Sequence, residues 1–85
     1  MNRRELPRRL VLGATANVAF GDMVDLVEGF GFHLSRVRGS HHIFVHSTVP
    51  ELVNFQEVHG QAKPYQIRQF LSLVERHDLR LEEAE

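Results

Sequence analysis

The chain has 85 residues, the length of one small domain, and a domain of this size has a thin core with no room for a deep catalytic pocket. It contains no cysteine, which excludes a disulfide framework, thiolate catalysis and cysteine-ligated zinc, and which fits the reducing cytosol. The longest apolar stretch is far short of the ~20 residues that span a membrane. The apolar patch at residues 10–12 is also too short for a secretory signal, so we expect a cytoplasmic protein without a membrane segment.

The net charge is only −1, but the charges are unevenly distributed along the chain. Residues 32–49 hold Arg36, Arg38 and four histidines without a single acidic residue. Residues 78–85, in contrast, hold four acidic residues and one arginine. The acid-free stretch also contains the most unusual motif of the chain, Gly-Ser-His-His at 39–42, which favours a functional reading of its charge.

Two helices are expected before the first strand. Residues 3–12 can form a short helix that ends at Gly13. The second helix spans Asp22 to Phe30, because apolar residues recur there at helical spacing. Gly21 is its expected N-cap, and Gly31 is expected to end it in a left-handed conformation.

Three short strands are expected next, connected by tight turns and a loop. In chain order, the predicted segments are the strand Phe32–Arg38, the turn Gly39-Ser40, the strand Ile43–His46, the turn Ser47–Glu51, the strand Leu52–Gln56 and the loop Val58–Lys63.

The two-residue turn predicts how the first two strands pair, since turn length sets the register of a hairpin. The expected pairs are Arg38 with His41, Arg36 with Ile43, and Leu34 with Val45. One face would then carry Arg36, Arg38 and His41 at the turn end, with apolar core at its far end through Phe32, Leu34, Ile43 and Val45. The other face would carry His33, Ser35, Val37, His42, Phe44 and His46.

A last helix is expected from Pro64, a residue favoured in the first turn, to near His77. Its predicted buried stripe consists of Tyr65, Ile67, Phe70, Leu71 and Val74. The sequence therefore predicts an α+β domain of order helix, helix, three antiparallel strands, helix. The helices would pack on one face of the sheet and leave the other face open.

Several chemistries are disfavoured by the spacing of the residues. His42 and His46 lie roughly 13 Å apart on a strand, too far to share an ion, and no third ligand completes a site with His33 and His46, so we expect no metal. Neither a nucleophile elbow around Ser40 nor a phosphate-cradling or dinucleotide-binding glycine motif is present. No cofactor is expected.

A histidine between arginines suits the cleavage of RNA. The 2′-hydroxyl of RNA can attack its own phosphate, so the protein must supply a base that titrates near neutral pH and positive charge for the phosphate oxygens. His41 can serve as the base, and Arg36 and Arg38 can clamp the phosphate. Histidines at strand ends are more often packing or solvated residues, so this reading needs further support.

Three stretches of the sequence resemble the HicA toxin family of type II toxin–antitoxin systems. They are Val24-x-Leu26-Val27-x-x-Phe30-Gly31-Phe32, then Arg36-Val37-Arg38-Gly39-Ser40-His41-His42-Ile43-Phe44, and later Gly60-Gln61-Ala62-Lys63-Pro64-Tyr65-Gln66-Ile67-Arg68-Gln69-Phe70-Leu71. The resemblance implies a fold like that of double-stranded-RNA-binding domains. It also implies a family core at residues 20–79, an N-terminal extension at 1–19 and an acidic tail at 80–85.

The resemblance further implies an mRNA-cleaving endoribonuclease (mRNA interferase) that needs no metal and is silenced by a HicB-type antitoxin. The family's catalytic histidine maps onto His41, with Gly39 and Ser40 as the turn that presents it. His42 and His59 are alternative second catalytic or supporting residues. The expected phosphate-binding residues are Arg36, Arg38 and Lys63.

Where the sequence departs from the family, the function stays open. Many family members place Pro-x-His near the third strand, but here the segment 55–60 has no proline and contains Glu57. The same fold could instead hold structured RNA by shape and phosphate contacts without cutting it. A third alternative is a protein-interaction domain whose histidine hairpin only docks a partner.

Overall fold

The structure, a computed structural model, describes residues 10, 13 and 15–81. Its two described helices are α2 (Phe20–Gly29) and α3 (Pro64–Arg76). Its strands are β1 (His33–Arg38), β2 (His41–His46), β3 (Val49–Val58) and β4 (Gln61–Ala62). The helix expected at 3–12 lies outside the described residues except for Leu10.

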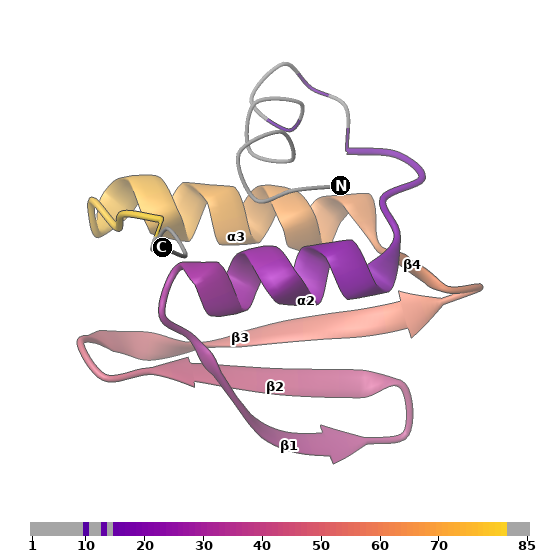
Figure 1. Ribbon diagram of the computed structural model, residues 1–85, viewed down its shortest axis with the longest axis horizontal. Coiled ribbons are helices and arrows are strands. Elements are labelled where there is room, and N and C mark those ends of the chain that lie inside the picture. The colour runs from indigo at the N-terminus through magenta and orange to yellow at the C-terminus, as the bar shows by residue number, and fades with distance from the viewer. Residues whose placement is uncertain (1–9, 11–12, 14, 82–85) are drawn as a thin grey trace.

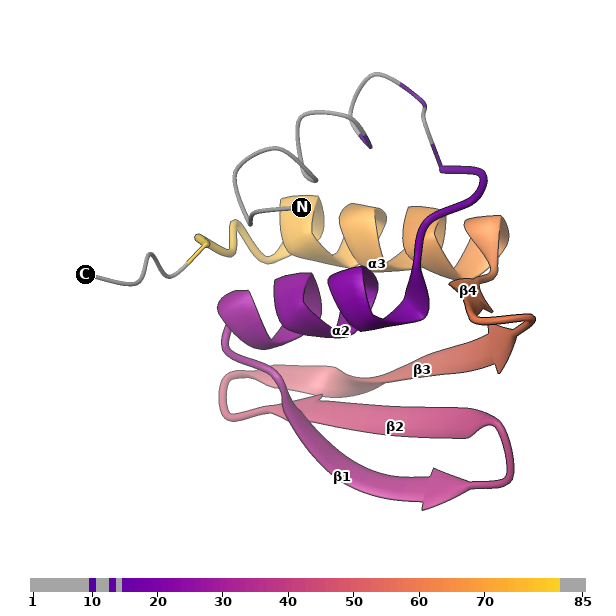
Figure 2. The ribbon, with the colours of Figure 1, turned by 45° about the vertical axis from the view of Figure 1, so that its right-hand side comes forward.

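The strands form one antiparallel sheet in the order β1-β2-β3-β4, and both helices pack on the same face of it (Figures 1 and 2). The predicted α+β class is therefore confirmed, with its helices on one side of the sheet. The arrangement is broadly that of a double-stranded-RNA-binding domain.

The structure has four strands in its sheet, whereas the sequence predicted three. The expected loop at 58–63 contains the end of β3 and the whole of β4, because His59 and Gly60 both adopt positive φ, 52° and 77°. Two successive residues with positive φ make the tight turn that matches the twist of a hairpin. β4 then pairs with the end of β3.

β3 is also longer than expected, since it begins at Val49 and not at Leu52. The predicted turn at 47–51 is only Ser47-Thr48, and Pro50 lies inside the strand. Proline is tolerated there because β4 pairs only with Glu57 and Val58, which leaves this part of the edge of β3 without a β4 partner.

α2 begins two residues earlier than predicted, with Ala19 as its N-cap in place of Gly21. It ends at Gly29, one residue before the predicted end, and Gly31 terminates it as predicted. Gly31 has φ 92°. Its N–H donates to the carbonyl of Glu28, and the N–H of Phe32 donates to the carbonyl of Val27. This double closure is the Schellman motif that a glycine after a helix favours.

α3 begins at Pro64 and ends at Arg76, close to the prediction, but its buried residues are Gln66, Ile67, Phe70 and Leu73, while Leu71 and Val74 are only partly buried. Tyr65 is 47% exposed, whereas Gln66 is only 5% exposed. The prediction that Tyr65 is buried is therefore wrong.

The pairing of β1 with β2 is as predicted at the turn end and differs further along. Arg38 pairs with His41 and Arg36 with Ile43, but Leu34 pairs with Phe44 and not with Val45. A bulge between Leu34 and Arg36 causes the shift, because the extra residue reverses the facing of the side chains beyond it.

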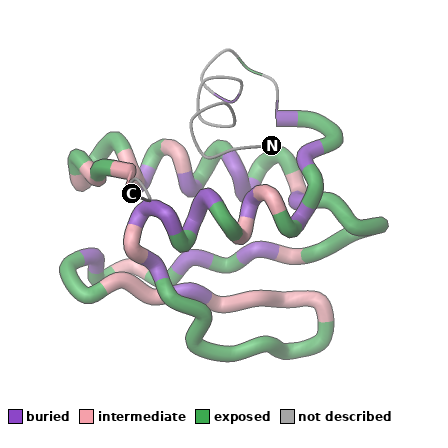
Figure 3. The backbone as a smooth tube through the Cα atoms, in the orientation of Figure 1, coloured by how far each residue is buried: buried purple, intermediate pink, exposed green. Residues whose placement is uncertain are grey.

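The assignment of the core to a face of the hairpin is also wrong. Phe44 is fully buried under the helices, while Leu34 is 47% exposed at the edge of the sheet. The helix-covered face of β2 therefore carries His42, Phe44 and His46, and their rings lie at contact distance from other rings of the core. Figure 3 shows that β1 is exposed along its whole length.

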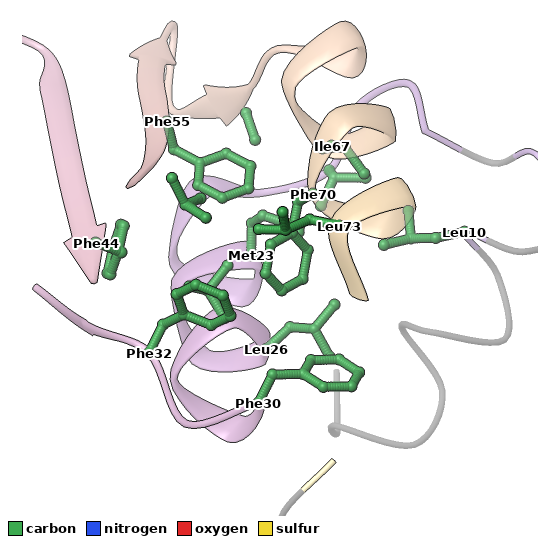
Figure 4. Packing of buried hydrophobic residues seen from close by; sticks show 14 of the residues in the cluster. Leu10, Met23, Leu26, Phe30, Phe32, Phe44, Phe55, Ile67, Phe70 and Leu73 are labelled. Atoms are coloured by element: carbon green, nitrogen blue, oxygen red, sulfur yellow. The ribbon is translucent and has the colours of Figure 1, made fainter. Parts of the chain in front are cut away.

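The core is a cluster of aromatic and aliphatic side chains between the sheet and the helices (Figure 4). Phe70 lies at its centre, with ring centroids 5.5–5.8 Å from those of Phe30, Phe32 and Phe55. Leu10 and Val18, which precede α2, also belong to this cluster and are 3% and 4% exposed. This packing fixes the sheet so that its other face is free to carry a site.

Candidate active site on the open face of the sheet

The turn between β1 and β2 is a two-residue turn built for glycine at its first position. Gly39 has φ 59°, a conformation that glycine adopts at little cost, and Ser40 has no such strain. The carbonyl of Ser40 accepts two hydrogen bonds, from the N–H of Glu57 at 3.0 Å and from Nδ1 of His42 at 3.2 Å. The turn is therefore tied to both β2 and β3.

His41 is the first residue of β2 and is half-buried on the face opposite the helices. Its Nδ1 lies 3.4 Å from Oδ1 of Asn54 on β3. Because an amide oxygen only accepts, this contact is a hydrogen bond in the tautomer that carries its proton on Nδ1. In that tautomer the lone pair resides on Nε2, which is then the nitrogen that can act as a base.

Arg36 and Arg38 lie on the same face as His41. Arg38 is directly opposite His41, and Arg36 is opposite Ile43, two residues further along β2. Both arginines are exposed. The register of the strands thus places two arginines and one histidine on the same open face, next to the tied turn.

The other predicted residues lie apart from this group. His42 points to the helix-covered face, where its ring centroid is 4.7 Å from that of Phe20. His59 is exposed in the turn between β3 and β4. Lys63 is the N-cap of α3, and its Nζ lies 5.8 Å from the ring centroid of Tyr65. In both ribbon views α3 begins at the end of the molecule that carries the β1–β2 turn (Figures 1 and 2).

The remaining histidines have structural contacts. Nδ1 of His46 accepts the N–H of Thr48 at 3.1 Å, and its ring packs against Phe32. His33 pairs with Val45 on the opposite face, so the cross-hairpin histidine pair considered from the sequence does not form. Among residues 10, 13 and 15–81, no group of three or more metal-ligating side chains is close enough to hold an ion.

Two residues beside His41 are not predicted from the sequence. Asn54 contacts its ring, and Gln56 is its direct partner on β3. Alternation along the predicted strand 52–56 puts both amides on one face with Leu52. The signal was therefore present, but it required the register between β2 and β3, which no short turn motif specified.

A hollow of about 340 Å³ lies between β3 and α3, and neither Arg36 nor Arg38 lines it. Asn54 and Gln66 line it, and Asn54 is also the residue whose side chain contacts His41. The basic group itself lies on the sheet surface. Such an open site suits a chain-like substrate better than a small molecule, because small molecules usually bind in enclosed pockets.

The fold and this surface define a small α+β domain with a histidine and two arginines on an open sheet face. A family model, HicA toxin of bacterial toxin–antitoxin, matches residues 20–75, which is more than half of the chain. The chain therefore belongs to the HicA toxin family. It is a toxin of a toxin–antitoxin system, and its implied partner is a HicB-type antitoxin. No curated protein and no solved structure gives a significant match. No helix within the described part of the chain is long and apolar enough to cross a membrane.

Proposed function

We propose that this toxin is a metal-independent endoribonuclease that cleaves mRNA in the cytoplasm, with His41 as its general acid or base. The observation that carries the proposal is the position of His41, which is directly opposite Arg38 on the open face and is oriented by Asn54. Membership of a toxin family supports an activity that harms the cell, and mRNA cleavage fits it.

The reaction uses the 2′-hydroxyl of the substrate as nucleophile. Nε2 of His41 takes the proton of this hydroxyl, and the oxygen then attacks the adjacent phosphorus. Arg36 and Arg38 stabilise the negative charge that builds up on the phosphate oxygens. The bond to the 5′-oxygen breaks, and that oxygen receives a proton from water or from a protonated histidine. The products are a 2′,3′-cyclic phosphate and a 5′-hydroxyl.

The remaining residues have supporting roles in this proposal. Gly39 and Ser40 form the turn that presents His41, and His42 holds the turn through the Ser40 carbonyl. His59 is the alternative source of a proton for the leaving oxygen, because it is exposed in the neighbouring turn. Lys63 contacts a phosphate further along the RNA. We also propose residues 20–79 as the catalytic core, with 1–19 as an extension and 80–85 as a tail.

The test is a cleavage assay of purified protein with single-stranded and structured RNA in EDTA. We expect wild type to cleave and His41→Ala to lose at least about 100-fold in rate, the usual contribution of a general acid–base residue. His33→Ala is the matched control, because His33 is an exposed histidine on the same face at the far end of β1. It should cleave as wild type does.

The outcomes separate the proposal from its rivals. Undiminished cleavage by His41→Ala would remove the assignment of His41 and direct attention to His59. RNA binding without cleavage by wild type, at high protein concentration, would support the non-catalytic binding module instead. Absence of a 2′,3′-cyclic phosphate in the products would contradict attack by the 2′-hydroxyl.

A further inference from the structure

The first turn of α3 exposes an aromatic ring and buries an amide, which reverses the usual preference. Tyr65 is 47% exposed and Gln66 is 5% exposed. Glutamine is mostly found on surfaces, whereas tyrosine is intermediate and so is buried more often than glutamine. Places where a structure departs from such preferences are where functional demands are expected.

The exposed ring is held in place by a hydrogen-bonded path that begins next to His41. Gln56 is the direct partner of His41 in the sheet. Its N–H donates to Oε1 of Gln66 at 2.7 Å, and Nε2 of Gln66 donates to the hydroxyl of Tyr65 at 3.4 Å. The buried amide of Gln66 therefore links the tyrosine hydroxyl to the strand beside the histidine.

A cation accompanies the ring. Nζ of Lys63 lies 5.8 Å from the ring centroid of Tyr65, within the range of a cation–π contact. Lysine beside an exposed aromatic ring is the combination by which proteins hold single-stranded RNA, with the base on the ring and the phosphate on the cation.

We propose that Tyr65 is a base-stacking residue, which binds an unpaired nucleobase close to the bond that is cleaved. This inference rests on the proposed function, since it names a subsite for the same RNA. The strand would lie across β2 and β3, with its reactive phosphate at Arg38 and His41. It would then pass over the β3 edge, and a neighbouring base would stack on Tyr65.

The chain offers a direct probe of this contact, because it contains one tyrosine and no tryptophan. Its ultraviolet emission therefore comes from Tyr65 alone. The ligands are uniform 2′-O-methylated RNA octamers of U, C or A, which lack the attacking hydroxyl and stay intact. Binding is followed in parallel by the anisotropy of a dye on the octamer, and Tyr65→Phe supplies the emission blank.

We expect the tyrosine emission of wild type to be quenched in step with binding. Tyr65→Leu keeps an apolar side chain without a ring, and it should bind about 5- to 150-fold more weakly, the range for loss of one base–aromatic stack. Tyr65→Phe keeps the ring and should bind within about 3-fold of wild type. Leu34→Ala removes an exposed apolar side chain from the helix-covered side of β1, away from the proposed RNA path, and should have no effect.

Three results would overturn the inference, and they differ in what they leave standing. If wild type binds without quenching and Tyr65→Leu binds equally well, the stacking role is wrong while the nuclease proposal stands. If no octamer binds to wild type, the RNA-directed function fails and the subsite fails with it. If Tyr65→Leu loses affinity for the antitoxin but not for RNA, the ring belongs to a protein interface.

Discussion

Nδ1 of His42 donates a hydrogen bond to the carbonyl of Ser40 at 3.2 Å, across the turn that precedes His41. The ring of His42 meanwhile packs on Phe20, the first residue of α2. A single side chain therefore connects the helix-covered core to the turn that presents the proposed catalytic histidine on the opposite face.

The two contacts of His42 can be separated by substitution. His42→Asn retains a donor near the position of Nδ1 and loses the ring, whereas His42→Phe retains the ring and loses the donor. We expect His42→Phe to lower the cleavage rate more than His42→Asn, because loss of the donor frees the turn. We expect each variant to cost about 1 kcal/mol of unfolding free energy, the usual effect of one hydrogen bond or of partial loss of packing.

Thermal unfolding and cleavage rates of both variants provide the measurements. If His42 positions the turn, the variant that lacks the hydrogen-bond donor should cleave more slowly, whichever of the two variants has the lower melting temperature. If the two variants cleave equally and differ only in stability, His42 is a packing residue and the link to His41 is wrong.

The elements that the sequence predicts well are those with a local signal. Gly39 and Gly31 mark the turn and the end of α2, and Pro64 marks the start of α3. The pairing of Arg38 with His41 follows from the turn alone, because a two-residue loop leaves no freedom in register.

What the sequence misses depends on contacts between distant segments. The bulge near Ser35 has no sequence signature, and it moves Leu34 out of its expected pair. Both faces of β2 carry apolar side chains, with Ile43 and Val45 on one face and Phe44 on the other, so alternation alone does not identify the face that is buried in the core. The long β3 settles this choice, since it places Val53 and Phe55 beside Phe44 and His42 on the helix-covered face.

Leu10 tests whether the segment before the family match is part of the fold. The match begins at residue 20, yet Leu10 is 3% exposed and lies beside α3 in the core (Figure 4). We expect Leu10→Ala to destabilise the protein by about 2–5 kcal/mol, the usual cost of emptying a buried leucine site. Leu52→Ala is the matched control, because Leu52 is 60% exposed and should change stability by less than about 0.5 kcal/mol.

Urea unfolding of the two variants gives both free energies. Equal stabilities would show that Leu10 does not hold the segment against the core. The extension would then be dispensable for folding.

The last prediction concerns acid. Glu51 on β3 bonds to Nε2 of His77 at 3.0 Å and to Nη1 of Arg76 at 3.0 Å, which joins the strand to the end of α3. The hydrogen bond from His77 is the largest cause that lowers the pKa of Glu51 below its ordinary value of 4.5. Because the folded-state pKa is the lower one, the ionised carboxylate stabilises the fold above the unfolded pKa, and this contribution is lost as the pH falls through the folded pKa.

We therefore expect the melting temperature of wild type to fall more steeply than that of Glu51→Gln between about pH 5 and about pH 3. At neutral pH, Glu51→Gln should melt slightly lower than wild type, and added salt should narrow that difference, since the pair is partly exposed. Glu57→Gln, a change at an exposed glutamate of the same strand, is the control and should retain the wild-type slope. Parallel acid profiles for wild type and Glu51→Gln would show that the ion pair does not connect β3 to α3 in solution.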